Sequence, residues 1–370
     1  MKSSLIVVGL VGLTTTAHSA PHEFAADVRP LFDGAACADP SAQPAHCKLV
    51  TAQLATWRTK FRDKAAPFFA REAATTETTV VYPFGGGDLV TALVVYPDAT
   101  DYTTLSLEGI GDPRVPVTAA RLAKLRDTLT VTLAWAWNTT IQLSIDSSES
   151  ARGDQLPAVL VASLVGLVAN GYEPLTVRYF SLADDGAVRY VDDDALAAWD
   201  REHHAAGHKQ TNSVQQGLFD DVEITFRAAR DANAPVKTWR HVTADLSDDA
   251  LAAHPGALAY LKTKPHVAAM TKAASYLLWK PTFSSIRGYL LQHAAQVVSD
   301  DTGVPPSLAP DWTYKVWGVY RGAHFEFADA ATAKELVALW RSAANQGAID
   351  FRFGYYDNAD HPHVMISKKP

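Results

Sequence analysis

The stretch at residues 80–109, VVYPFGGGDLVTALVVYPDATDYTTLSLEG, decides the fold. A short apolar run rich in β-branched residues, 78–84, ends at three successive glycines, and Asp88 then stands where a helix N-cap is expected. Residues 89–96 place apolar side chains on one helix face, and 102–107 form a second β-rich apolar run. A strand, a short helix and a second strand in succession favour a parallel strand pair. The sequence therefore predicts a mixed α/β fold.

The three glycines match no nucleotide-binding motif. A P-loop requires a Lys-Ser or Lys-Thr pair that is absent here, and the G-x-G-x-x-G spacing fails because Leu89 stands two residues after Gly87. Two interpretations stay open. In the first, the glycines form a strand-to-helix corner that needs positive φ or close backbone approach, with Asp88 as the cap. In the second, Gly86 and Gly87 bind a ligand, and Asp88 faces a cleft at the carboxyl edge of the sheet.

A second acid, Glu108, follows the second predicted strand. If the two strands are parallel neighbours, Asp88 and Glu108 leave the sheet at the same edge. Two carboxylates at one edge can divide acid and base roles in catalysis or share a divalent cation. The structural alternative is that these acids cap turns or pair with Arg114.

A third acidic group lies late in the chain, at Asp300 and Asp301, within VVSDDTGVPP. Consecutive carboxylates after an apolar run can bind a metal ion or act as catalytic acids. The Asp-Thr-Gly triplet occurs in a helix-rich setting and lacks the second copy that an aspartic protease would need. A turn before Pro305 is the structural alternative. No residue is assigned as a metal ligand, and no cofactor follows from the sequence.

Apolar periodicity predicts further helices and strands along the chain. Helices are expected at 49–73, from Thr118 onward, at 156–169, 248–262, 266–278 and 283–295, and between Asp329 and Gly347. Strands are expected as a hairpin at 175–191, at 222–227, 238–246 and 314–320, and as a final hairpin formed by AIDFRFGYY and HVMIS. The tryptophans, Trp199 among them, are expected in the core more than on a sugar-binding surface.

The mature chain divides into an N-terminal α/β half at 20–191, a polar surface excursion at 192–220 and a C-terminal α/β half at 221–370. The excursion contains EHHAAGH, with histidines at 203, 204 and 208. It lacks the glutamate of an H-E-x-x-H metal motif, which favours a solvated loop.

An internal repeat is one hypothesis for the two halves. Residues 80–116 can be laid against 276–306, because each has an apolar run near a proline, an amphipathic helix, a second apolar run, acids, then Gly and Pro. The predicted helix at 266–278 opposes this alignment, since it would make Tyr276 a helix end and not a strand residue.

The N-terminus predicts export. Lys2 precedes an apolar run, 5–13, that is too short to span a bilayer, and Ala17 with Ser19 forms a small-x-small cleavage site, so 1–19 is a predicted signal peptide. The mature chain has no apolar run of membrane-spanning length. A net charge of −7 and a pI near 6.0 argue against nucleic acid as a partner. The expected location is the periplasm or the extracellular space.

The chain contains two cysteines, Cys37 and Cys47, in the loop-like segment CADPSAQPAHC. In an oxidising compartment a disulfide that closes this short loop is expected. Zinc binding with the neighbouring His46 is the alternative, although the usual C-x2-C spacing is missing.

Several blocks resemble an uncharacterised family of exported bacterial proteins: YPFGGGD (residues 82–88), YPDA (96–99), LSLEGIG (105–111), and SSIRGYLL with SDDTGVP (284–305). That family has a Y-P-F-x-G-x-D block, an L-E-P-x-G-like block and a late D-D-[ST]-G-[IV]-P block. Gly109 replaces the expected proline, and the histidine-containing excursion has no counterpart. The resemblance implies that the protein is exported and that the family similarity covers most of the mature chain. It implies no mechanism. Arg287, within SSIRGYLL, is a candidate ligand-binding residue together with Gly86 and Gly87.

The sequence thus leads to three hypotheses of function. The first is an exported protein that binds a small molecule or divalent cation in an acid-lined cleft, without chemistry. The second is a hydrolase that uses Asp88 with Glu108, Asp300 or Asp301. The third is a structural or interaction protein of the cell envelope whose acids only form turns. Carboxylates gathered in a concave site would favour the first two hypotheses.

Overall fold

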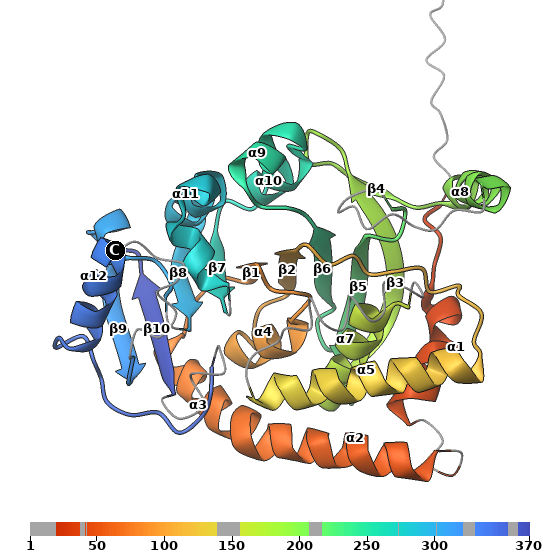
Figure 1. Ribbon diagram of the computed structural model, residues 1–370, viewed down its shortest axis with the longest axis horizontal. Helices are drawn as coiled ribbons and strands as arrows, with labels where there is room; N and C mark the ends of the chain where they lie inside the picture. Colours follow the sequence, from red (N-terminus) through yellow and green to blue (C-terminus); the bar gives the residue numbers. More distant parts are fainter. Residues whose placement is uncertain are drawn as a thin grey trace, which may run out of the picture.

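The computed structural model describes residues 20–37, 41, 43–138, 156–206, 217–272, 274–300, 302–320, 330–353 and 362–370. The predicted signal peptide and Asp301 lie outside these residues. The described chain is a mixed α/β fold around one sheet of ten strands, in the order β4-β3-β5-β6-β2-β1-β7-β8-β10-β9 (Figure 1). None of the described helices combines the length and apolarity needed to cross a bilayer.

The five central strands are parallel, and both edges of the sheet are antiparallel. The central strands are β6 (Lys237–Thr243), β2 (Asp101–Ser106), β1 (Thr79–Pro83), β7 (Val267–Thr271) and β8 (Ala294–Ser299). The edge strands are β4 (Val188–Tyr190), β3 (Tyr172–Leu182) and β5 (Asp221–Ala228) on one side, and β10 (His363–Lys368) and β9 (Thr313–Gly318) on the other. The predicted parallel pair of β1 and β2 is confirmed.

Helices cover both faces of the sheet, which gives three layers (Figure 1). On one side of the sheet lie α1 (Ala25–Ala36), α2 (Pro44–Trp57), α3 (Asp63–Glu72), α4 (Leu89–Val95), α5 (Ala119–Asn138) and α7 (Ala158–Ala169). Of these, α1, α4 and α7 contact the strands, and α2 packs on the outer side of α5. On the other side lie α9 (Asp248–Ala253), α10 (Gly256–Lys262) and α11 (Ser284–His293). Because strand side chains alternate, Val80 and Tyr82 of β1 join the first apolar core and Val81 joins the second.

Shorter elements complete the chain. A π-helical turn, η1 (Arg58–Arg62), joins α2 to α3, and α8 (Asp193–Ala206) and α12 (Ala330–Trp340) lie toward opposite ends of the sheet (Figure 1). The 3-10 turns are η2 (Ser275–Trp279), η3 (Pro281–Phe283) and η4 (Pro306–Leu308).

Strand order changes direction between β1 and β7. From β1 the chain passes through α4 to β2 on one side, whereas from β7 it passes through α11 to β8 on the other. Ligands of open α/β sheets bind outside the carboxyl ends of the strands at such a switch point. The topology therefore predicts a ligand site at the carboxyl ends of β1 and β7.

The predicted helix at 266–278 is wrong. Its first part is β7, and Tyr276 lies in η2. Val267–Thr271 is buried on both faces of the sheet, and such a continuous apolar run cannot be told from a buried helix by periodicity alone. The proposed repeat alignment thus matches β1 with η2, whereas the strand that precedes α11 is β7. The unit β7-α11-β8 repeats the strand-helix-strand order of β1-α4-β2.

Two further expectations differ from the structure. The final hairpin is wrong: residues 348–353, the described part of AIDFRFGYY, form no strand, and β10 pairs with β8 and β9 instead. The polar excursion contains the helix α8 and is not only a loop, although His208 and its neighbours at 207–216 lie outside the described residues. Strands from both predicted halves alternate in the one sheet, where β2 pairs with β6 and β1 with β7.

The predicted disulfide between Cys37 and Cys47 is present, with the two α-carbons 5.3 Å apart. We expect replacement of both cysteines by serine to lower the free energy of unfolding by about 2–3 kcal/mol, because the bond restricts a loop of this length in the unfolded chain. Denaturant unfolding of the two proteins measures the difference. Identical midpoints would show that the bond does not contribute to stability.

Candidate functional site

Asp88 lies at the carboxyl end of β1 and caps α4, as the sequence predicts. Thr91 N donates to Asp88 Oδ1 at 3.0 Å, while Tyr82 Oη at 3.2 Å and Lys272 Nζ at 3.0 Å donate to Oδ2. Asp88 is 0% and Lys272 3% exposed, so this is a fully buried ion pair. Its two members come from the ends of β1 and β7, on either side of the switch point.

Asp300, which follows β8, belongs to the same buried network. Ser275 donates to Asp300 Oδ1 at 2.5 Å and lies within hydrogen-bonding distance of Thr302. Burial lowers the pKa of Lys272, whereas Asp88 and then Asp300 act in the opposite direction. The same two carboxylates add to burial in raising the pKa of Tyr82. The structure therefore brings Asp88 and Asp300 together around Lys272 and Tyr82.

The glycine loop is a packed corner. Gly86 and Gly87 have φ angles of 54° and 79°, which favour glycine, and both are buried. A β-carbon added at Gly87 would lie 2.6 Å from Val159 Cγ1 of α7, and Ser163 of the same helix donates to the Gly87 carbonyl. These observations support the first interpretation of the sequence, in which the glycines allow a tight turn and close helix packing.

Glu108 leaves the same edge of the sheet, beyond β2, and is 4% exposed. Its backbone carbonyl is held by a relay of hydrogen bonds. Trp239 Nε1 donates to Thr104 Oγ1 at 2.9 Å, Thr104 lies 3.0 Å from His241 Nδ1, and His241 Nε2 lies 2.7 Å from the Glu108 carbonyl. This arrangement assigns the proton of a neutral His241 to Nε2. The relay fixes the chain just after β2. From there the chain turns toward Asp220, whose carbonyl accepts a hydrogen bond from Ile110 N.

Arg287 forms no hydrogen bond with the described residues of this network. Its Nη1 donates to the carbonyls of Leu278 and Lys280 at 2.8 and 3.0 Å, so it fastens the turn before α11. Of the sequence-predicted residues, the structure thus joins Asp88 with Asp300 and places Glu108 beside β6.

A cavity of about 370 Å³ opens at the same edge of the sheet, where β3 and β6 end and β5 begins. Its ionisable side chains are Asp184, Asp220, Asp221 and His254, and no lysine or arginine is among the described residues that line it. The apolar part of the lining is formed by Phe180, Leu182, Trp199, Leu218, Val242 and Ala257. A volume and lining of this kind fit a small organic ligand.

Asp221 is the most buried of the three acids that line this cavity. It is 9% exposed, Thr243 N donates to its Oδ1 at 2.7 Å, and no described residue forms a hydrogen bond to Oδ2. Burial raises the pKa of Asp221 well above its usual value, the Thr243 hydrogen bond acts against this, and Asp220 adds to it. A buried carboxyl group with one oxygen available in a cavity is typical of a binding site.

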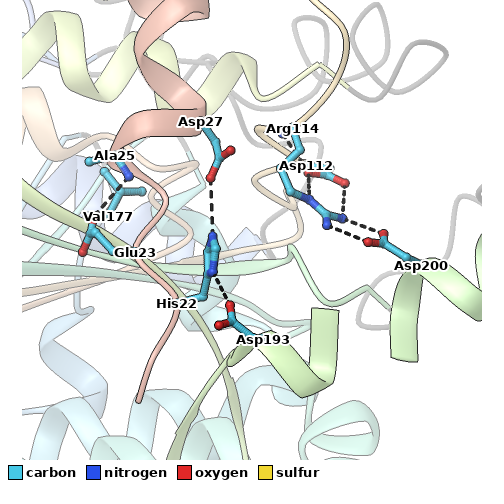
Figure 2. Close-up of polar contacts among 9 residues, drawn as sticks. All are labelled: His22, Glu23, Ala25, Asp27, Asp112, Arg114, Val177, Asp193 and Asp200. Atoms are coloured by element: carbon cyan, nitrogen blue, oxygen red, sulfur yellow. Dashed lines mark hydrogen bonds and ion pairs between the residues drawn. The ribbon is translucent and has the colours of Figure 1, made fainter. Parts of the chain in front are cut away.

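The wall that contains Trp199 is helix α8, which ion pairs fasten to the body of the protein (Figure 2). His22 Nδ1 lies 2.6 Å from Asp193 Oδ1 at the start of the helix. Asp200, the residue that follows Trp199, receives two 3.2 Å hydrogen bonds from Arg114, which also binds Asp112. The Arg114 guanidinium stacks 4.8 Å from the centre of the Phe219 ring, which in turn contacts the Trp199 ring.

We expect Arg114→Ala to loosen α8, since it removes both the ion pair to Asp200 and the contact with Phe219. Amide hydrogen exchange in α8 should become about tenfold faster, which corresponds to roughly 1.4 kcal/mol of local stability. The matched control is Arg29→Ala, which removes an exposed pair with Asp33 on α1. Equal exchange in both variants would contradict an anchoring role for Arg114.

Among the described residues, no group of three or more His, Cys, Asp or Glu side chains could hold a metal ion. His203 and His204 lie on α8. Comparison with family models, with curated proteins and with solved structures found no match to this chain.

Sequence reasoning missed Lys272, Tyr82, Asp184, Asp220, Asp221 and Trp199. Lys272 directly follows β7, so recognition of that strand would have placed a lysine at the switch point. The acids of the cavity had no such signal, because Asp220 and Asp221 stand just before and at the start of an antiparallel strand, and Asp184 lies in a hairpin turn. Trp199 is half-buried: it packs against the apolar core, as expected, and also lines the cavity, which was not expected.

Proposed function

We propose that this protein is an exported binding protein for a small organic molecule, with its site in the cavity at the carboxyl end of β6. The observation on which this rests is the buried Asp221 carboxyl group, whose Oδ2 accepts no hydrogen bond from the described residues in a cavity of about 370 Å³. This is the acid-lined cleft of the first sequence hypothesis, formed by acids other than those expected. The Cys37–Cys47 disulfide supports an oxidising location, and the resemblance to exported bacterial proteins supports the same proposal.

The hydrolase hypothesis has weaker support. Asp88 and Asp300 act on the same lysine, as a shared site requires. However, Asp88, Lys272 and Asp300 are each exposed by 3% or less, so a substrate would find almost no accessible atom there. The network links the ends of the neighbouring strands β1 and β7, and we infer that its role is to stabilise the fold.

Ligand-observed NMR with a library of uncharged, anionic and cationic fragments tests the proposed function. Ser181, exposed at the cavity rim, offers a blocking variant: Ser181→Trp should abolish the saturation transfer seen with wild-type protein. The control is Ala52→Trp, an exposed position on α2, a helix that contributes no residue to the described lining. The proposal fails if no fragment binds, or if every bound fragment is unaffected by Ser181→Trp.

A further inference from the structure

The charge of the cavity restricts its ligand. Three carboxyl groups line it, Asp184 from the β3–β4 turn and Asp220 with Asp221 at the start of β5, and His254 after α9 is the one other ionisable group among the described lining residues. Gly217 N donates to Asp220 Oδ2 at 2.7 Å, which holds that carboxylate beside Asp221. Such a site repels anions and attracts cations.

The apolar lining restricts the ligand further. Phe180 and Trp199 provide aromatic surface beside the acids, and Leu182, Val242 and Ala257 provide aliphatic surface. Aromatic rings attract ammonium and guanidinium groups, and apolar side chains favour an organic body over a hydrated inorganic ion. A metal ion also lacks a suitable ligand group among the described residues.

We infer that this cavity binds an organic cation, an ammonium or guanidinium group attached to an apolar body, with the charged group directed to Asp184, Asp220 and Asp221. This inference rests on the proposed function and names the class of its ligand. Asp221 Oδ2 supplies the buried acceptor, and Trp199 with Phe180 supplies the surface for the apolar part.

The burial of Asp221 couples ligand binding to a change in the protonation state of its carboxyl group. Burial favours the neutral carboxyl group in the empty cavity, and the neighbouring Asp220 acts in the same direction. A bound cation favours the carboxylate. Binding therefore releases the Asp221 proton to the buffer, as the neutral acid and the cationic ligand become a carboxylate–cation pair and a free proton. The other titratable groups of the described lining are Asp184, Asp220 and His254, which face the same space.

Three aromatic probes of similar size test the inference: benzylammonium, the uncharged benzyl alcohol and the anionic benzoate. Isothermal titration calorimetry should give benzylammonium at least about tenfold higher affinity than benzyl alcohol, and benzoate should not bind. Equal or tighter binding of benzyl alcohol or benzoate, or displacement of benzylammonium by calcium ions, would overturn the inference. If only uncharged or anionic fragments bind in the cavity, the organic-cation inference is wrong and the proposed binding function still holds. If no fragment binds, both the inference and the proposed function are wrong.

Titration in two buffers of different ionisation enthalpy tests the proton release. Wild-type protein should release a proton on binding benzylammonium, and its affinity should rise by up to tenfold per pH unit below the pKa of Asp221. Asp221→Asn keeps an acceptor for Thr243 N and the shape of the side chain, so it should fold, lose at least about tenfold in affinity and release no proton from this position. The control, Asp184→Asn, should weaken binding while proton release persists. Unchanged proton release in Asp221→Asn would contradict the assignment.

Discussion

Asp88→Asn is expected to lower the free energy of unfolding by about 3 kcal/mol or more, the largest effect of any single substitution considered for this chain. The change leaves the Lys272 ammonium group buried without its main partner, and removal of one member of a buried ion pair typically costs about 3–5 kcal/mol. Asp300 acts on the same lysine, which places the expected loss toward the lower end. Urea unfolding at neutral pH measures it.

The substitution separates the charge of Asp88 from its capping role. Asparagine keeps an oxygen that can accept from Thr91 N, and loss of a cap alone costs about 1 kcal/mol. The matched control is Asp192→Asn, at a residue that accepts from Ala195 N at the start of α8. Equal losses at Asp88 and Asp192 would show that Asp88 acts only as a cap.

A double variant completes the experiment. Lys272→Met alone leaves the Asp88 carboxylate buried without its ammonium partner and should also destabilise the protein. Asp88→Asn with Lys272→Met replaces the pair by neutral groups of similar shape, so it should lose less than the sum of the two single variants. Additive losses would contradict the direct coupling that the 3.0 Å contact implies.

The second large expected effect is a loss of stability in acid that is caused by His241. Burial lowers the pKa of His241 from 6.5 to about 4, although its hydrogen bond to the Glu108 carbonyl acts in the opposite direction. Between these values the unfolded chain binds a proton that the folded protein does not. Stability from this histidine is therefore complete above pH 6.5 and falls by about 3 kcal/mol as the pH drops to about 4.

Comparison of variants isolates this effect from other acid-sensitive groups. His241→Gln should be less stable at neutral pH, because it disturbs the relay from Thr104 to Glu108, but its stability should fall less steeply in acid. His254→Gln, at an exposed histidine, should follow the wild-type curve. Parallel acid curves for wild type and His241→Gln would show that His241 does not stay neutral in the folded protein.

Local features of the fold were predictable because they depend on neighbours in the sequence. The order of strand, glycine corner, Asp88 cap and strand gave the parallel pair of β1 and β2, and the short spacing of Cys37 and Cys47 gave the disulfide. The apolar run of α7 predicted a helix buried on all sides, and eleven of its residues are buried. In each case the residues that determine the feature are close together in the sequence.

Buried central strands were harder to identify from the sequence. Val267–Thr271 is covered on both faces, so it lacks the alternation that distinguishes an exposed strand from a helix. The error had a functional consequence, because it hid the position of Lys272 at the end of β7. Asp88 and Asp300 could be suspected from their places after apolar runs, yet the lysine between them could not.

The sequence by itself determined the α/β class, the β1-α4-β2 unit, the capping role of Asp88 and the cysteine pair, since helix periodicity, capping and short loop closure act over a few residues. Only the tertiary structure decided which acids share a site. Lys272 joins Asp88 because β7 lies beside β1, and Asp184, Trp199 and Asp221 surround one cavity because β3, α8 and β5 meet at one edge. Strand order and helix docking arise from burial of apolar surface across the whole chain, and the spacing of residues along the sequence does not record them.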